Sequence, residues 1–521
     1  MPQRRFRTEP WLWLGLLAVV LPASASAQDG SLAERVARIS ARPEFRHAMF
    51  GVKVVALDRD STLFSLNADK LFVPGSTTKL LTTGTALELL GGDYRFHTRV
   101  YRMGNVAADG TLSGDLVLVA SGDPNLSHRI SGDSLLFVDE DHSYGSDPAT
   151  DLIPGDPLQV LRTLAAQVKA HGIRRIAGAV RVDASLFNGG ERELGTGATI
   201  SPIVVNDNIV DITAAAGNAV GAPAWLTVSP ATAYLRVVNR VVTGPADSNS
   251  TGDVAVDSLN TDGTRTIVLT GRKKFGEPPR MISYKVPEPD RFAAAGFRLA
   301  LEELGIRISL AAARTSTAPG YAADRMVAEH VSPPFREAAK VILKVSQNLH
   351  ASMMPYLLGA LLKGGKDAQA GFDLEHEFLT KAGLDLTGAV QSDGAGGAAL
   401  FTPDFMVGYL AFMARQKSAA DFQRGLPILG RDGTLAKISQ DVPAAGHVYA
   451  KTGTFVSSDL LNRGLVVDGK GLAGYLTTRS GRPLAFAIYI NRVTLSNPDL
   501  VQSLVGQAAG DIAATIYDAV P

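Results

Sequence analysis

The residue pattern of this chain changes character twice, and this change constrains the fold more than any other feature. The segments 28–95 and 331–521 mix helical and strand patterns, whereas residues 96–330 are mainly short Val- and Ile-rich runs separated by Gly, Asp, Asn and Pro. The two end segments together have the length of one ordinary domain. We therefore predict an α/β domain, built from both end segments and interrupted by a mostly β insertion of one or two subdomains.

The first of these segments has clear local signals. Ser31 and Glu34 form a capping-box pattern at the start of a short helix. Residues 51–57 and 62–66 are predicted to be the two strands of a hairpin. Residues 76–90 then contain no proline and end at a pair of glycines, which predicts a helix.

The later segments supply the remaining elements. In the insertion, two helical stretches at 158–170 and 292–304 interrupt the strand pattern. The final segment is predicted to hold a helical stretch with a break near Pro355, then three strands and a closing helix. These elements cover residues 334–362, 448–454, 472–477, 484–490 and 499–520.

Residues 1–27 have the pattern of a cleaved signal peptide. Three arginines precede an apolar run at 11–21, and Ala25-Ser26-Ala27 matches a small-residue cleavage site. The apolar run is too short to span a bilayer, which needs roughly 20 residues. We expect a periplasmic mature chain with no transmembrane anchor. Peripheral membrane contact and the choice between Sec and twin-arginine export stay open.

Composition excludes several function classes. The chain has 51 basic and 51 acidic residues, whereas a nucleic-acid-binding surface needs a basic excess or stripe. The compact basic run Arg272-Lys273-Lys274 lies next to a glycine, and we interpret it as a solvated turn. No cysteine occurs, which rules out disulfides, a thiol nucleophile and a cysteine-ligated metal.

The first candidate catalytic motif is Ser76-Thr77-Thr78-Lys79, at the start of a predicted helix. Residues three apart share a helical face, so the Lys79 amine can lie beside the Ser76 hydroxyl. Serine needs an adjacent base to attack at neutral pH, and lysine serves as one only if burial or nearby positive charge lowers its pKa. A solvated Ser–Lys pair is also common on helices, so this motif alone does not identify a catalytic site.

The second motif is Ser346-Gln347-Asn348, after an apolar stretch. The Ser346 hydroxyl could relay a proton to a leaving amine, while Asn348 could bond a substrate amide. An ordinary turn would have the same residue types.

The third motif is Lys451-Thr452-Gly453-Thr454, on a predicted strand. A cation followed by a small hydroxyl suits a peptide that ends in a carboxylate, and Gly453 lets the substrate backbone approach closely. A strand-edge lysine is the alternative. The three motifs in this order, however, are the signature of penicillin-binding proteins and serine β-lactamases.

With these motifs in place, the chain resembles the low-molecular-mass class C penicillin-binding proteins, the D-alanyl-D-alanine carboxypeptidase/endopeptidase family. The long β-rich gap between the first two motifs distinguishes this family from serine β-lactamases. The resemblance implies a penicillin-binding transpeptidase-like (serine β-lactamase-like) domain. Further matching runs are Gly122-Asp123-Pro124-Asn125-Leu126, Val205-Asn206-Asp207-Asn208, Ser332-Pro333-Pro334, 344–349 and Asp393-Gly394-Ala395-Gly396.

The resemblance also implies residue roles. Ser76 would be the acylated nucleophile, Lys79 its base and Ser346 the proton shuttle. The backbone N–H groups of Ser76 and Thr454 would form the oxyanion hole. No metal or cofactor is implied. The substrate-binding set would be Asn348, Lys451, Thr452, Gly453 and Thr454.

Three features depart from the family pattern or extend it. Gln347 stands where the family usually has aspartate. Gly397-Ala398 replaces hydroxyl-bearing residues that many relatives have at the pocket edge. An acidic loop, Asp139-Glu140-Asp141-His142, could bind a cation, but we interpret it as a solvated charge cluster.

The function implied is a serine D-alanyl-D-alanine carboxypeptidase, with endopeptidase activity as a variant of the same chemistry. Its partners would be peptidoglycan peptides, with β-lactam antibiotics as covalent inhibitors. A serine β-lactamase and a non-catalytic cell-wall-binding protein are the alternatives. The balance between the two peptidase activities, the diamino acid of the stem peptide and the oligomeric state do not follow from the sequence.

Overall fold

The computed structural model describes residues 30–127, 129–139, 141–146, 153–309 and 320–520. The predicted signal peptide at 1–27 and Glu140 lie outside the described residues. Within the described ranges, no helix is both long enough and apolar enough to cross a membrane.

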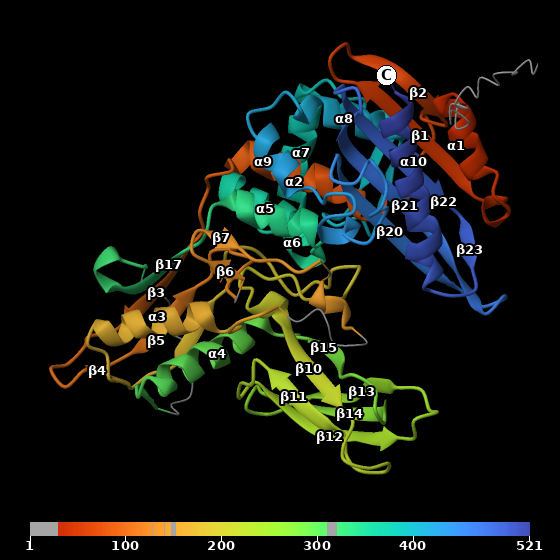
Figure 1. The fold of residues 1–521 in the computed structure, drawn as a ribbon. Coiled ribbons are helices and arrows are strands. Elements are labelled where there is room, and N and C mark those ends of the chain that lie inside the picture. Colours follow the sequence, from red (N-terminus) through yellow and green to blue (C-terminus); the bar gives the residue numbers. More distant parts are fainter. Residues whose placement is uncertain (1–29, 128, 140, 147–152, 310–319, 521) are drawn as a thin grey trace, which may run out of the picture.

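One antiparallel sheet joins the two ends of the chain (Figure 1). The predicted N-terminal hairpin is present, and its first strand pairs with a strand near the C-terminus, from Met49↔Asn491 to Ala56↔Leu484. Segments far apart in sequence therefore form one sheet. Its strands, in spatial order, are β2 (Ser61–Leu66), β1 (Met49–Ala56), β22 (Pro483–Asn491), β21 (Gly464–Thr477) and β20 (Val448–Asp459), with β23 (Val493–Leu495) also paired to β21.

Helices cover both faces of this sheet, and alternate side chains of β22 are buried in two different cores, one on each face. Phe486 and Ile488 enter one core with residues of α1 (Leu32–Ser40) and α10 (Gln507–Ala519), which follows the π-helical turn Val501–Gly506. The alternate residues Ala485 and Ala487 enter a second core. Successive strand residues face opposite sides, so a strand buried on both faces is apolar throughout.

The second core is built mainly from helices on the other face of the sheet. The predicted helical stretch at 334–362 is present, but its break lies at residues 345–347, and Pro355 sits inside a continuous helix. The prediction of a break at Pro355 is therefore wrong. The helices are α2 (Lys79–Leu90), α5 (Phe335–Lys344), α6 (Asn348–Lys363), α7 (Gln369–Lys381), α8 (Pro403–Met413) and α9 (Ala419–Gly425).

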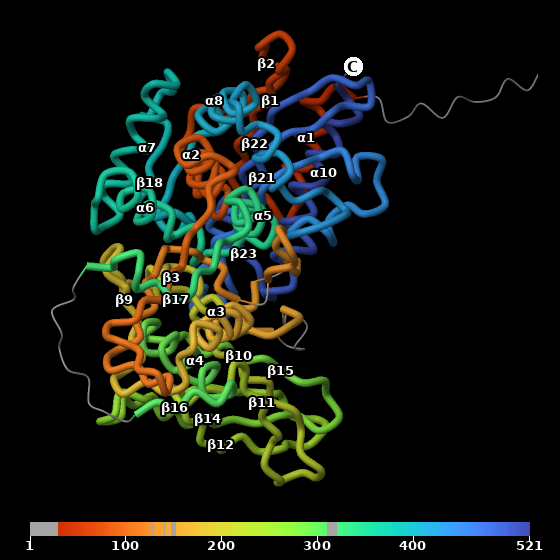
Figure 2. The backbone as a smooth tube through the Cα atoms, turned by 90° about the vertical axis from the view of Figure 1, so that its left-hand side faces the viewer, coloured from red at the N-terminus to blue at the C-terminus, as the bar shows by residue number. Residues whose placement is uncertain are grey.

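The middle of the chain has its own hydrophobic core, whose buried members run from Val100 to Ala328. The chain leaves and re-enters the first part through two paired strands, β3 (His97–Met103) and β17 (Met326–Val331), which lie between the two parts in the rotated view (Figure 2). We retain 96–330 as the proposed bounds of the insertion.

The elements of this middle region form small sheets and two covering helices. One sheet has the order β17-β3-β5-β9, and others are β11-β10-β15, β12-β14-β13 and β16-β8-β4. The elements are β4 (Thr111–Leu112), β5 (Asp115–Val119), α3 (Gln159–Ala170), β8 (Arg175–Ile176), β9 (Val180–Asp183), β10 (Ile209–Ala215), β11 (Trp225–Ser229), β12 (Leu235–Gly244), β13 (Thr251–Leu259), β14 (Arg265–Lys274), β15 (Arg280–Lys285), α4 (Pro289–Glu303) and β16 (Arg307–Ile308).

The basic run Arg272-Lys273-Lys274 is not the solvated turn that we predicted. It is the end of β14, and Lys273 is buried. The Lys273 amine lies 2.7 Å from a carboxylate oxygen of Glu277, which supplies a counter-charge. A buried lysine is tolerated when it is paired in this way.

A buried group of charged side chains joins the middle region to the first turn of α6. Asp207 accepts hydrogen bonds from Arg129 Nη2 at 2.7 Å, His142 Nε2 at 3.0 Å and His350 Nε2 at 2.8 Å. All four side chains are almost completely inaccessible to solvent. Because His350 follows Asn348 by two residues, this charge cluster fixes the start of α6 against the middle region.

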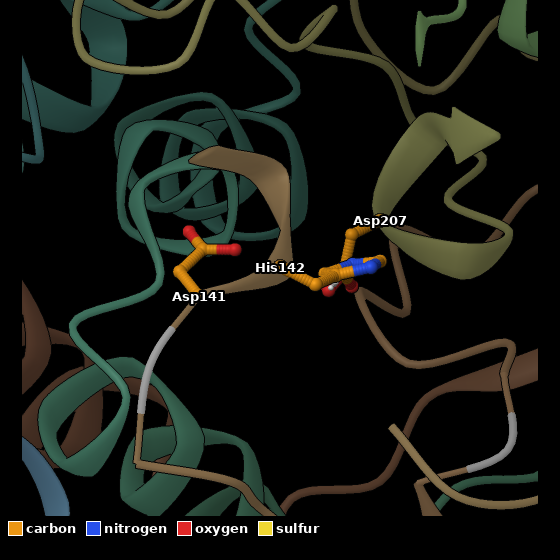
Figure 3. Close-up of side chains that lie close together, drawn as sticks. All are labelled: Asp141, His142 and Asp207. Carbon is orange, nitrogen blue, oxygen red and sulfur yellow. Dashed lines mark hydrogen bonds and ion pairs between the residues drawn. The ribbon is translucent and has the colours of Figure 1, made fainter. Parts of the chain in front are cut away.

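The acidic loop belongs to this cluster, so the prediction of a solvated group of charges is wrong for two of its residues. Asp141 is 4% exposed and His142 is 1% exposed, whereas Asp139 is exposed. Figure 3 shows His142 next to Asp207, with Asp141 to one side. The Gln347 side-chain amide donates to Asp141 at 3.3 Å, which links the loop to the second motif.

Both ring nitrogens of His142 face carboxylates: Nδ1 lies 2.9 Å from Asp211 and Nε2 lies 3.0 Å from Asp207. An ionised carboxylate only accepts hydrogen bonds, so both nitrogens must carry hydrogen and the ring is an imidazolium. Burial alone would lower the pKa of His142, but the carboxylates of Asp211 and Asp207 outweigh it and raise the pKa to about 10.

We predict that His142→Gln lowers the free energy of unfolding by about 3–5 kcal/mol, because it leaves buried carboxylates short of one positive charge. Chemical denaturation followed by circular dichroism measures the change. His376→Gln, an exposed histidine on α7, is the matched control and should stay within about 0.5 kcal/mol of the wild type.

The same variant has a pH signature. Because the folded-state pKa of His142 lies above its unfolded value, its stabilising effect is complete below about pH 6.5 and is lost as the pH rises through about 10. The stability gap between the wild type and His142→Gln should therefore narrow over that range. A gap that is constant or widens with pH would show that His142 is not charged in the folded protein.

Candidate active site

The first motif lies where a short 3-10 turn, Gly75–Thr78, leads into α2. The α-helix thus begins at Lys79, three residues later than the predicted start at Ser76. Gly75 has φ +51°, a left-handed conformation that suits glycine. The turn places the Lys79 amine 2.8 Å from the Ser76 hydroxyl.

The Lys79 amine has two other partners, from distant parts of the chain. It lies 2.5 Å from Asn348 Oδ1, at the first residue of α6, and 3.2 Å from the main-chain oxygen of Ala395. The first two motifs and the Asp393–Gly396 loop therefore meet at one amine. Asp393 shapes that loop by accepting hydrogen bonds from three backbone N–H groups, those of Ala395, Gly396 and Ala398.

The Lys79 side chain is completely buried. Burial penalises its charged form and lowers its pKa to about 8, while the carboxylates of Glu193, Asp393 and Asp141 act in the opposite direction. A substantial fraction of this amine is therefore neutral near pH 8 and available as a base.

The third motif lies on β20. Lys451 is completely buried, and its amine donates to the Thr452 carbonyl at 2.9 Å. Burial, together with the positive charges of Lys79 and Lys470, holds the pKa of Lys451 well below its usual range. The Thr452 hydroxyl lies 2.7 Å from the Thr434 hydroxyl. This end of the site is thus rich in amines.

Two glycines bring the first and third motifs together. A Cβ on Gly453 would lie 2.0 Å from the Pro74 carbonyl oxygen and 3.0 Å from the Ser76 nitrogen. A Cβ on Gly75 would lie 2.6 Å from the Thr454 nitrogen. Beyond the predicted approach of a substrate, Gly453 is therefore needed so that β20 can pack against the turn that carries Ser76.

Ser346 lies in the turn between α5 and α6, with φ +66° and a half-buried side chain. Its hydroxyl has no hydrogen-bond partner in the part of the chain that the structure describes. The structure thus places Ser346 two residues before Asn348 but does not bond it to Ser76 or Lys79.

Sequence reasoning missed two side chains of the middle region. The Asn348 amide donates to the Tyr144 hydroxyl at 2.7 Å, and the Glu193 carboxylate accepts the Gly195 N–H at 2.7 Å beside this amide. A Cβ on Gly195 would lie 2.0 Å from Asn348 Nδ2, which shows how close this loop comes. No local sequence pattern around Tyr144 or Glu193 indicates that they lie near Asn348, which is distant in sequence.

The charge cluster does not fit a metal ion, although ligand atoms of Asp141, His142 and Asp207 lie within 4.8 Å of one another. Both nitrogens of His142 are taken up by carboxylates, and Asp207 already accepts from Arg129, His142 and His350. Arg129 and the His142 imidazolium therefore already supply the positive charge that a metal ion would bring to Asp207.

Comparison with known proteins finds relatives over nearly the whole chain. The chain matches the model of the D-Ala-D-Ala carboxypeptidase 3 (S13) family over residues 32–509. It is 28% identical to the D-alanyl-D-alanine carboxypeptidase of an Actinomadura species, over 97% of this chain and 90% of that protein. It is 24% identical to D-alanyl-D-alanine carboxypeptidase DacB of Haemophilus influenzae, over 90% of this chain and 89% of that protein.

The fold is shared with a solved structure. The crystal structure of penicillin-binding protein 4 from H. influenzae superposes with a TM-score of 0.71 at 21% identity, covering 93% of this chain and 99% of that one. The predicted α/β class and the predicted resemblance are both confirmed. The chain belongs to the D-Ala-D-Ala carboxypeptidase 3 (S13) family.

Proposed function

We propose that this chain hydrolyses the D-alanyl-D-alanine end of peptidoglycan stem peptides through an acyl-enzyme on Ser76. One observation carries the proposal: the buried Lys79 amine bonds the Ser76 hydroxyl and Asn348 at once. Family membership supplies the substrate class, and the site supplies a nucleophile beside a base of suitable pKa. The mature chain would act in the periplasm.

The hydrogen bonds of Lys79 suggest how the base is aimed. A neutral amine has two hydrogens and one lone pair. The Asn348 amide oxygen and the Ala395 carbonyl can accept the two hydrogens, which leaves the lone pair directed at the Ser76 hydroxyl. Lys79 would then take the hydroxyl proton as the Ser76 oxygen attacks the carbonyl carbon of the penultimate D-alanine.

The other motif residues would support this step. The backbone N–H groups of Ser76 and Thr454, brought close by Gly75 and Gly453, would stabilise the oxyanion, and Lys451 and Thr452 would hold the terminal carboxylate. Breaking the peptide bond releases D-alanine, whose amine would receive its proton through Ser346. Water would then hydrolyse the Ser76 ester and regenerate the enzyme.

β-Lactam antibiotics would acylate the same serine, because they mimic the D-alanyl-D-alanine end. Penicillin-binding protein 4 of H. influenzae has been solved in complex with a β-lactam. The lifetime of the adduct on this chain separates a peptidase from a serine β-lactamase. Minutes to hours supports the peptidase, and rapid turnover supports the β-lactamase.

Carboxypeptidase and endopeptidase action would use the same catalytic groups on different substrates. Purified mature protein incubated side by side with a pentapeptide and a cross-linked muropeptide gives the balance between them by chromatography of the products. Failure to cleave either substrate would favour a non-catalytic wall-binding protein.

We predict that Ser76→Ala lowers the rate of D-alanine release from a pentapeptide by about 10⁴-fold or more, because no other group can form the ester. An enzymatic D-alanine assay measures the rate. Ser503→Ala, at an exposed serine of the C-terminal π-helical turn, is the control and should retain full activity. Wild-type rates in Ser76→Ala would remove Ser76 from the mechanism.

We also predict a pH profile. Only the deprotonated Lys79 amine can accept the serine proton, so acylation by a fluorescent penicillin should rise about tenfold per pH unit and level off above about pH 8. The measurement is the second-order labelling rate between about pH 6 and 9.5 in the wild type. Lys79→Arg, which cannot deprotonate, should label very slowly throughout. A wild-type rate independent of pH would contradict Lys79 as the base.

A further inference from the structure

Lys470 is a buried lysine outside the three motifs. Burial lowers the pKa of its amine to about 8, so at neutral pH the amine is still mostly protonated and positively charged. It lies on β21, directly opposite Thr454 of β20, and its side chain is almost completely buried. Its amine has two neutral partners, Thr454 Oγ1 and Gln502 Oε1, each at 2.8 Å. Within the described ranges it forms no ion pair with a carboxylate. A buried ammonium without a counter-charge is costly, so its position calls for an explanation.

The bond to Thr454 fixes the orientation of the threonine hydroxyl. An ammonium group only donates hydrogen bonds, so Thr454 Oγ1 must accept from Lys470. The hydroxyl hydrogen of Thr454 then remains for a different acceptor. Thr454 is itself exposed, unlike Lys470, so that acceptor can arrive from solvent.

The surroundings indicate the charge of that acceptor. Lys470 is close enough to Lys451 to lower its pKa, together with burial and Lys79. Neither Lys451 nor Lys470 has a carboxylate partner in the described part of the chain, whereas Glu193, Asp393 and Asp141 act on Lys79. The positive charge at the β20 end of the site is therefore not balanced by a carboxylate of the described residues, which favours the binding of an anion there.

We propose that Lys470 is a positioning residue for the substrate's terminal carboxylate: it holds the Thr454 hydroxyl with its hydrogen toward that carboxylate and contributes uncompensated positive charge beneath it. The inference rests on the proposed function, which places the carboxylate at Lys451 and Thr452, and it adds to that site the hydroxyl of Thr454, two residues further along β20. It adds to the three motifs a residue that no motif contains.

A purely structural role is the competing explanation, because Lys470 also joins the β20–β21 hairpin to the C-terminal turn through Gln502. The two explanations differ for a ligand without a carboxylate. A structural defect would slow every ligand alike, whereas loss of a carboxylate partner should slow only the charged one.

The test compares acylation of the full mature chain by benzylpenicillin and by its methyl ester, with intact-protein mass spectrometry as the readout. We expect the wild type to be acylated faster by the free acid than by the methyl ester. In Lys470→Met the ratio of these two acylation rates should fall about tenfold, because acylation by the free acid becomes slower. Lys381→Met, an exposed lysine on α7, is the control and should keep the wild-type preference. An unchanged preference in Lys470→Met, or equal slowing with both ligands, would overturn the inference.

Thr454→Val gives an independent test if Lys470→Met does not fold. It removes the hydroxyl that Lys470 orients and should reduce the same preference in the same direction. If both variants fold, the double variant should lose less than the product of the single effects, because both act on one hydrogen bond. Unchanged preference in Thr454→Val would also overturn the inference. Absence of any penicillin adduct on the wild type would instead defeat the proposed function.

Discussion

The Lys79 amine is the interaction on which the arrangement of the site depends. It is completely buried and is held by the Ser76 hydroxyl, the Asn348 amide oxygen and the Ala395 carbonyl. These three partners come from the 3-10 turn before α2, the start of α6 and a loop between two short strands. A buried amine is tolerated only where acceptors surround it, so the requirement to satisfy Lys79 aligns the parts that carry the chemistry.

Two further constraints make this alignment specific. Gly75 and Gly453 let the turn that carries Ser76 pack directly on β20, where any Cβ would collide with backbone atoms. On the other side, the charge cluster around Asp207 ties the first turn of α6 to the middle region through His350. The middle region is thus part of the support for Asn348, and Tyr144 extends that support to the side chain itself.

Much of this could be predicted from local sequence signals. The capping box at Ser31, the N-terminal hairpin and the helix end at Gly91 follow from short-range rules, and the structure has all three. The motif residues were also identifiable, because the three motifs occur together in the order that is the signature of penicillin-binding proteins and serine β-lactamases. Features that depend on tertiary structure could not be predicted in this way. The break in the helical stretch lies at Ser346, which has a left-handed backbone conformation beside the site, whereas Pro355 lies inside the continuous helix α6. Asp141 is buried where the distant Gln347 side chain donates to it, and Lys273 is buried on β14 beside Glu277, four residues further along the chain.

In the proposed mechanism Ser76, activated by Lys79, is the residue that becomes acylated. The most direct measurement is to treat the purified mature chain with benzylpenicillin, digest it and locate the added mass by tandem mass spectrometry. We expect a single penicilloyl adduct on Ser76. An adduct on Ser346 or on any other residue, with Ser76 unmodified, would contradict it.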